Sequence, residues 1–471
     1  MKTPSIENFL EFEREYKCNS IQAMGIPVWT LYRYEIHNTI KKHTVGREEG
    51  SQTPFSKKEL WAMALNAIKP LPNKKVDVLF VADGRRNRNI DTGVYENIFF
   101  DEVSKRFNSL LVEHPDNHTH LQPNGMDNVY FTDRVAFKTN LAVKFANKFN
   151  TKKKQAYTKA VIESYCKIFD AIKDTFGTDI KEELIDGFVE RMYYFEITKK
   201  YCSKILDRVQ PKLIMELCYY SMESFAYSAL GKERGIPTAE YAHGFAFPTH
   251  TPMQFNQDEK NSTVLPDAHL TFSKTQESVV HFPSDVKIVT VGFPFFERER
   301  EKYKAKFPRD EKTICFVSTL AEGEQISKIA SGVAELIGDE YHIIYKLHPK
   351  EYSYYRERFP WLLNDKIDVI DNNDNHMFKF LAESKIIVST RTASVEEGIG
   401  FGCEVILLDY GDTRINMSYY IDNGIPIVDS VDEVVDLIKN DRAGSIDANG
   451  IYEPGAMENM CKYIREKLGT V

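Results

Sequence analysis

A lysine and a histidine two residues apart, in the segment "YHIIYKLHPKE" at 341–351, form the first candidate binding group of this chain. Lys346 and His348 follow an apolar run, and side chains two positions apart in a strand point to the same side. Two donors that converge in this way suit one anion such as a phosphate, and Pro349 fixes the backbone of the turn beyond them. The alternative is a polar strand end with a structural, hydrogen-bonded histidine.

A hydroxyl-rich loop further along the chain is the second candidate anion-binding group. A loop that leads into a helix near Ser394 offers free N–H groups and the positive end of the helix dipole to an anion, and Arg391 adds a further donor. The alternative is that Thr392 or Ser394 only caps the helix, with Glu396 and Glu397 balancing its dipole. Polar residues of this loop and of a similar strand end are Ser389, Thr390, Arg391, Thr392, Ser318 and Thr319.

The segment "IPTAEYAHGFAFPTH" at 236–250 is the candidate reacting group of the first half. A buried strand is expected to end at His243, with Glu240 three residues before it. Gly244 permits a sharp turn that leaves the histidine exposed at the edge of the sheet. His243 or Glu240 is therefore predicted to act as a general base or to position an acceptor. The alternative is a core histidine beside a buried, paired glutamate.

Two cationic segments have both a functional and a structural interpretation. The loop after the expected strand 76–84 carries Asp83, Arg85, Arg86 and Arg88, an arginine cluster that would hold an anionic acceptor or else form a solvated loop. The lysine-rich helical stretch 147–159 would contact an anionic membrane surface or else form a solvated helix face, which is the favoured alternative. "DNNDN" at 371–375 indicates a turn rather than a metal site.

Alternating apolar runs and amphipathic segments from residue 74 onward are typical of βαβ units and parallel sheets. In such sheets ligands bind beyond the carboxyl ends of the strands, which is where the polar groups above lie. The expected strands are 76–84, 212–217, 238–244, 268–273, 286–292, 313–318, 341–347, 366–370, 385–389, 404–409 and 425–428.

The same pattern predicts an α/β protein of two domains. An N-terminal domain is expected over 1–295, with a helical insertion at about 101–200. A charged linker, "FEREREKYKAKFPRDEK" at 296–312, then leads to a C-terminal domain over 313–471, whose last helix can pack back on the first domain.

Composition excludes several classes of protein. The chain has 471 residues, of which 42% are hydrophobic and 28% charged, and its net charge of −8 argues against a general nucleic-acid binder. No apolar run approaches the ~18–20 residues of a membrane span, and the first residues lack the features of a signal peptide. Seven scattered cysteines without a CxxC pair fit a reducing cytoplasm. We expect a cytoplasmic protein with no metal site.

The chain resembles GT-B glycosyltransferases of bacterial surface-polysaccharide biosynthesis. "VGFPFF" (291–296), "YKLHP" and "VSTRTASVEEGIGFGCEVILLD" (388–409) look like the His-Pro and Ser/Thr donor-site motifs of bacterial sialyltransferases, Kdo transferases and CDP-glycerol polymerases. The segment 236–250 is similar to the E-x-Q-H-G segment of capsule and lipopolysaccharide proteins, although Ala242 replaces the Gln.

The resemblance implies two Rossmann-like domains that face each other across a cleft, and metal-independent transfer of a sugar from a nucleotide. It favours a CMP-linked donor and leaves UDP-, GDP- and CDP-linked donors open. It implies a glycan or lipid-linked glycan acceptor, and contact with the inner membrane or with polysaccharide assembly proteins. His243 or Glu240 would lie nearest the reacting centre. The implied donor-site residues are Lys346, His348, Ser389, Thr390, Thr392, Glu397, Ser318 and Thr319.

Two other enzymatic functions and one non-enzymatic function are alternatives. The enzymes are a glycerol-phosphate or sugar-phosphate polymerase and a GT-B epimerase of the UDP-N-acetylglucosamine 2-epimerase kind. The third is a catalytically silent nucleotide-sugar binder that scaffolds a polysaccharide assembly complex. Polar strand ends in both halves of the chain argue against the silent binder, because binding alone requires polar groups in only one of the two domains.

Overall fold

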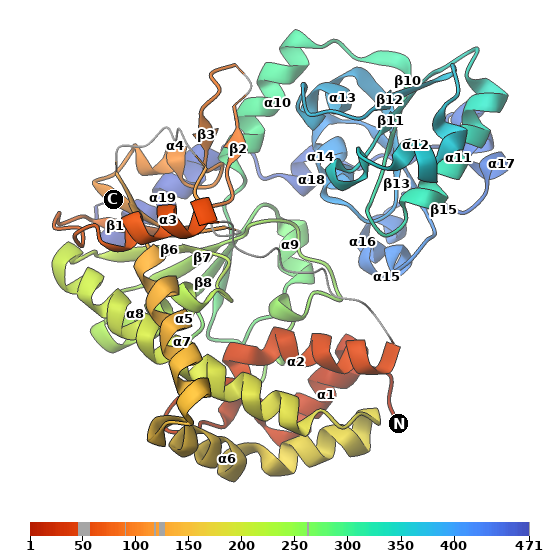
Figure 1. Ribbon diagram of the computed structural model, residues 1–471. Coiled ribbons are helices and arrows are strands. Elements are labelled where there is room, and N and C mark those ends of the chain that lie inside the picture. Colours follow the sequence, from red (N-terminus) through yellow and green to blue (C-terminus); the bar gives the residue numbers. More distant parts are fainter. Residues whose placement is uncertain (46–56, 90, 117–118, 122–127, 261–262, 471) are drawn as a thin grey trace.

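Two parallel sheets, each within its own α/β domain, form the body of the protein (Figure 1). The computed structural model describes all residues except 46–56, 90, 117–118, 122–127, 261–262 and 471. The N-terminal sheet has the strand order β5-β4-β1-β6-β7-β8-β9. Its strands are β1 (Val78–Asp83), β4 (Ser109–His114), β5 (Val129–Phe131), β6 (Leu213–Leu217), β7 (Thr238–Tyr241), β8 (Ala268–Thr271) and β9 (Lys287–Thr290).

The C-terminal sheet has the strand order β12-β11-β10-β13-β14-β15, and all of its neighbouring pairs are parallel. The two parallel α/β domains agree with the fold that the sequence predicts. The strands of this sheet are β10 (Asp310–Val317), β11 (His342–Lys346), β12 (Ile367–Ile370), β13 (Ser384–Ser389), β14 (Glu404–Leu408) and β15 (Ile427–Val428).

Helices cover the faces of both sheets, so the central strands are buried throughout. Every residue of β1 and of β6 is buried, which is why their sequences are nearly unbroken apolar runs. The longer helices are α1 (Ile6–Tyr16), α2 (Val28–Val45), α3 (Lys57–Ala67), α5 (Asp133–Phe149), α6 (Lys152–Phe176), α7 (Lys181–Val209), α8 (Met222–Arg234), α10 (Pro294–Lys306), α11 (Gly323–Ile337), α14 (Ala393–Phe401), α17 (Val431–Lys439) and α19 (Ala456–Leu468). None of the helices in the described ranges is long and apolar enough to span a bilayer.

The helical insertion begins later than the sequence predicts. Residues 101–132 hold β4 and β5, which belong to the sheet, and the long helices start at Asp133. They pack with α1 and α2 around an aromatic core that includes Trp29 and Phe188. A buried pair ties this core to the sheet domain: Arg33 is bound to Glu13 and also donates to the carbonyl of Gln254 at 2.6 Å.

The charged segment between the domains is mostly helical. α10 occupies 294–306 and β10 begins at Asp310, so only a few residues of the expected linker are extended. The chain later returns, and α19 packs against α4 (Asp101–Ser104) and β6 of the N-terminal domain. The carboxylate of Glu297 accepts hydrogen bonds from the backbone N–H groups of Gly455 (2.8 Å) and Ala456 (3.0 Å) at the start of α19.

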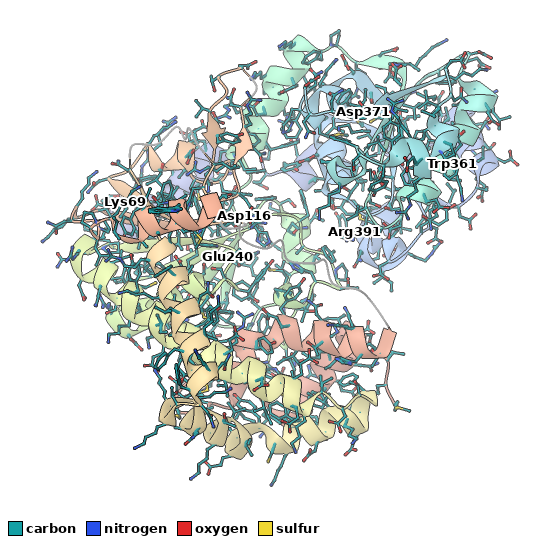
Figure 2. The ribbon with its side chains drawn as sticks, in the orientation of Figure 1. Lys69, Asp116, Glu240, Trp361, Asp371 and Arg391 are labelled. Carbon is teal, nitrogen blue, oxygen red and sulfur yellow. The ribbon has the colours of Figure 1, made fainter. Side chains whose placement is uncertain are left out.

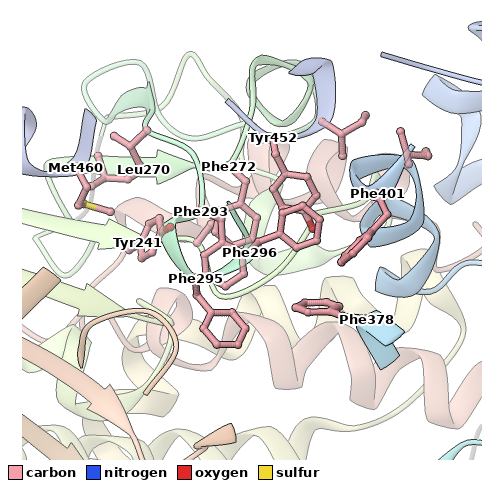
Figure 3. Packing of buried hydrophobic residues seen from close by; sticks show 14 of the residues in the cluster. Tyr241, Leu270, Phe272, Phe293, Phe295, Phe296, Phe378, Phe401, Tyr452 and Met460 are labelled. Atoms are coloured by element: carbon pink, nitrogen blue, oxygen red, sulfur yellow. The ribbon is translucent and has the colours of Figure 1, made fainter. Parts of the chain in front are cut away.

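Aromatic side chains fill the place where these two segments cross (Figure 3). Phe296 stacks on Tyr452 with ring centroids 3.8 Å apart, and Phe272 stacks on Phe293 at 4.6 Å. The same buried cluster reaches strands of both sheets. The crossing therefore joins the two domains through apolar burial as well as through the chain.

Substituting Gly292 tests how much this crossing contributes to stability. Gly292 has φ +83°, and an added Cβ would lie 2.4 Å from the carbonyl oxygen of Glu453. Gly455, at φ +73°, has no atom within 4 Å of the same position. Both Ala variants carry the left-handed strain of about 1–2 kcal/mol, and Gly292→Ala adds about 1–3 kcal/mol of overpacking.

We expect urea unfolding to give a clearly larger loss of free energy for Gly292→Ala than for Gly455→Ala. Equal losses of unfolding free energy in the two variants would show that the packing of the returning chain against Gly292 adds little to stability beyond the effect of the glycine backbone conformation.

Candidate functional site

The polar ends of three neighbouring strands form one wall of a cavity of about 770 Å³ that both domains line. β11, β10 and β13 are adjacent in the C-terminal sheet, and parallel strands bring their carboxyl ends to the same edge. The sequence-predicted residues in this wall are Ser318, Lys346, His348, Pro349 and Thr392.

Lys346 is a buried cation with no carboxylate partner within the described structure. The residue is 7% exposed, and Nζ donates to the Tyr352 hydroxyl at 2.5 Å and to the carbonyl of Asn372 at 3.1 Å. Burial lowers the pKa of Lys346, because the ammonium loses hydration that neutral oxygens only partly replace. An anion in the cavity would supply the missing negative charge.

His348 lies beyond the strand rather than within it. β11 ends at Lys346, and His348 caps the short 3-10 helix Pro349–Glu351. Its Nδ1 accepts a hydrogen bond from the backbone N–H of Lys350 at 3.2 Å, and its own N–H donates to Glu351 at 2.8 Å. Because Nδ1 accepts, the proton of the neutral ring is on Nε2, and burial lowers the pKa of His348 and favours this form.

The hydroxyl-rich loop is divided between the sheet and the cavity. Ser389 donates to the carbonyl of Val317 at 2.7 Å, which ties β13 to β10. The hydroxyls of Thr390 and Thr319 lie 3.3 Å apart. Of these residues only Thr392 is in the described wall of the cavity, where it also caps α14. The N-terminus of α14 is therefore capped by a residue that also faces the cavity.

Arg391 and Glu397 are not in the described wall of the cavity. The Arg391 guanidinium lies 4.1 Å from the ring centroid of Phe247, which belongs to the N-terminal domain. Nearby, the Thr249 hydroxyl donates to the side-chain oxygen of Asn416 at 2.8 Å. This hydrogen bond and the contact between Arg391 and Phe247 both join the two domains. Burial, together with Glu396, raises the pKa of Glu397 to about 8.

The opposite wall comes from the N-terminal domain, from the short hairpin β2 (Asn87–Arg88) and β3 (Tyr95–Glu96). Arg86 lines the cavity, but its charge is balanced by Glu113 (2.8 Å) and Asp101 (3.1 Å). Of the predicted acceptor residues, Arg88 also lines the cavity. Asp83 and Arg85 instead bind each other.

The prediction that Glu240 reaches the reacting centre does not agree with the structure. Glu240 has no exposed surface, and its carboxylate accepts from the N–H of Tyr219 at 3.0 Å and contacts Nδ1 of His269 at 2.6 Å. Figure 2 places it within the N-terminal sheet, whereas Arg391 belongs to the C-terminal domain. The buried, paired glutamate is the correct interpretation.

His243 lies two residues beyond the end of β7, is only partly buried, and is not in the described wall of the cavity. Its Nε2 lies 3.1 Å from the Tyr220 hydroxyl, and its buried Nδ1 has no hydrogen-bond partner among the described residues. Burial lowers the pKa of His243 below its ordinary value of 6.5. Burial also raises the pKa of Tyr220, so its hydroxyl keeps its proton.

Several residues that line the cavity were not predicted as site residues. The residues of the turn 371–375 could have been found from the position of this turn. The turn follows β12, which is the neighbour of β11 in the sheet, and it therefore lies at the same edge of the sheet as the end of β11. The additional lining residues are Asn87, Tyr95, Asn373, Asp374, Asn375, His376, Met377 and Ser394.

Comparisons with known proteins yield distant structural similarity alone. No family model and no curated protein matches the chain. The UDP-GlcNAc 2-epimerase from Neisseria meningitidis is 14% identical, covers 84% of this chain and 100% of its own, and has a TM-score of 0.47. The enzyme of that name from Methanocaldococcus jannaschii is 12% identical (83% and 99% covered, TM-score 0.46), and the glycotransferase of kitacinnamycin is 9% identical (84% and 95%, TM-score 0.41). Similarity this distant carries no argument about reaction or substrate.

The tautomer of His348 predicts different effects for two substitutions. Asn keeps a side-chain acceptor for the N–H of Lys350 but cannot reach as far as Nε2 does, whereas Gln can place a donor near that position. We expect His348→Asn to weaken pyrophosphate or nucleotide binding by about 10- to 100-fold, the value of a hydrogen bond to a charged group. His348→Gln should lose less.

Titration calorimetry of the two variants measures this difference, and thermal unfolding provides the control for folding. Equal affinity of His348→Asn and the unchanged protein would remove His348 from the anion site.

Proposed function

We propose that this protein is an enzyme that binds a nucleotide-activated sugar in the cavity between its domains and transfers the sugar to a glycan acceptor. The observation that carries the proposal is Lys346, a buried ammonium that has only neutral hydrogen-bond partners and lines the same cavity as His348. A phosphate supplies the charge that this wall lacks. The cavity volume of about 770 Å³ is within the roughly 300–1,000 Å³ of small-molecule sites.

The arrangement suits breakage of the bond between a sugar and a nucleotide phosphate. Negative charge develops on the departing phosphate, and Lys346, His348 and the N-terminus of α14 are donors fixed before the reaction begins. Their fixed positions follow from contacts made without any ligand, such as the hydrogen bond from Lys350 to His348. The sugar then extends toward the N-terminal domain, where Arg88 and Tyr95 form the facing wall.

His243 is the proposed base for the acceptor hydroxyl. When Nε2 carries the proton and donates to Tyr220, the buried Nδ1 keeps a free lone pair. His243 is outside the described wall of the cavity, so the acceptor hydroxyl would have to reach Nδ1 from there. A base whose pKa lies below 6.5 is in its working form at neutral pH. The proposed acceptor is a surface glycan, such as a capsule or lipopolysaccharide chain, or a lipid-linked precursor of one.

Epimerisation of the bound nucleotide sugar is the second candidate, because the wall formed by Lys346 and His348 would hold its phosphate in the same way. Inversion at a carbon that bears hydrogen needs one group that removes a proton and one that returns it. The His243 ring and the Tyr220 hydroxyl are hydrogen-bonded to each other at 3.1 Å, so they would have to separate before they could act on opposite faces of such a carbon.

One experiment separates these reactions from simple binding. We expect one member of a panel of CMP, CDP, UDP, GDP and dTDP to raise the melting temperature, because a ligand of the native state stabilises it. The matching nucleotide sugars are then followed by NMR with and without oligosaccharide acceptors. Acceptor-dependent release of nucleotide supports transfer, and a new sugar isomer still bonded to the nucleotide supports epimerisation. Stabilisation without turnover would contradict both.

The pH dependence of the reaction tests His243. Because the pKa of His243 is lowered from 6.5, its basic form persists above neutrality and is lost only as the pH falls through that lowered value. We expect kcat/KM to be flat near pH 7 and to fall on an acidic limb below about 6.5. His243→Ala should reduce kcat by about 10²–10⁴-fold and remove the limb, while nucleotide affinity is unchanged. An unaltered pH profile in that variant would exclude His243 as the base.

A further inference from the structure

The solvent-facing side of α5 combines large apolar side chains with lysines. Phe137, Leu141, Phe145 and Phe149 are between 48% and 61% exposed. They are spaced four residues apart, so they form a row along the helix surface. The inner face of α5, by contrast, is buried against the domain through Val135, Val143 and Ala146 among others.

Helix α3 extends this apolar surface. α3 packs against α5, and Arg134 in the first turn of α5 donates to the carbonyl of Ala67 at the end of α3. Trp61 and Leu65 of α3 and Ile68 just beyond it are 71%, 56% and 74% exposed. We call these seven residues of α3 and α5 the apolar row. It is far larger than the single apolar side chains scattered over most protein surfaces.

The charge along the α5 part of the apolar row has one sign. Between residues 134 and 162 the chain carries eight lysines and arginines and no acidic residue, although its net charge is −8. Lys138, Lys144 and Lys148 are exposed on α5. Each lies three positions from Leu141 or Phe145, and therefore next to the row. None of the three forms an ion pair within the described part of the chain.

We propose that this surface binds the face of an anionic lipid bilayer, with the apolar row in the interfacial layer and the lysines against the headgroups. The chemistry distinguishes this partner from a protein. Lysine is depleted at the centre of protein–protein interfaces, whereas a bilayer accepts aromatic side chains and lysines side by side. The inference does not depend on the proposed reaction, because no residue of the row lines the cavity.

Vesicle co-sedimentation of the full chain tests the proposal. We expect binding to phosphatidylglycerol vesicles, weakening as salt is raised, and little binding to phosphatidylcholine vesicles. Phe145→Ser combined with Phe149→Ser, and separately Lys144→Glu combined with Lys148→Glu, should each reduce the partition coefficient at least tenfold. Leu336→Ser is the matched control, because Leu336 is 55% exposed on α11 of the other domain, and it should bind as the unchanged protein does.

Three outcomes would overturn the proposal. One is absence of binding to anionic vesicles. Another is equal loss of binding in the Leu336→Ser control. The last is a dimer in lipid-free solution that the Phe145/Phe149 double variant dissociates while vesicle binding is unaffected, which would make a second copy the occupant of the surface. Thermal unfolding of the same variants without ligand shows that each is folded, so a failure of the proposed nucleotide binding leaves this test unaffected.

Discussion

The crossing of two chain segments between the domains is the constraint on which the site depends. A single connection at 291–296 would let the two sheets turn freely. The return of the chain at 451–456, with Tyr452 stacked on Phe296 and Glu297 bound to the start of α19, adds a second connection. The carboxyl ends of β11 and β10 thereby face the hairpin of the N-terminal domain, and one cavity is lined by both.

The two walls of this cavity are charged in different ways. On the N-terminal side Arg86 is balanced by Glu113 and Asp101. On the C-terminal side Lys346 is bound only to a hydroxyl and carbonyl oxygens. Since a buried charge without a counter-charge is costly, the anionic part of a ligand is stabilised more by the C-terminal wall. The neutral part then lies toward the N-terminal domain, which fixes the direction in which a nucleotide sugar would enter.

Most of the sheet framework could be predicted from the sequence, because buried parallel strands are recognisable apolar runs. β4 and β5 were missed, since they lie among charged and aromatic residues that indicate helix, and the insertion was therefore placed too early. Lys346 and His348 could be found from their position at a strand end. The contribution of the turn 371–375 to the cavity could not be predicted from its composition, because that composition indicates only a turn. Its place in the cavity follows from the order of the strands in the sheet.

Strand pairing explains which predicted site residues reach the cavity. Glu240 pairs with His269 of β8, and Ser389 pairs with Leu407 of β14. Both are within the paired part of a sheet, where neighbouring strands take up their polar atoms. His348 and Thr392 lie beyond the last paired residue of their strands, and so their side chains are available to a ligand. Lys346 is itself the last paired residue of β11, opposite Ile370, and only its length brings the ammonium to the cavity. Polar residues just beyond the last paired residue of a strand are therefore the better candidates for ligand-binding residues in such a sequence. A cationic residue with a long side chain is the one type that can reach the ligand from within the strand.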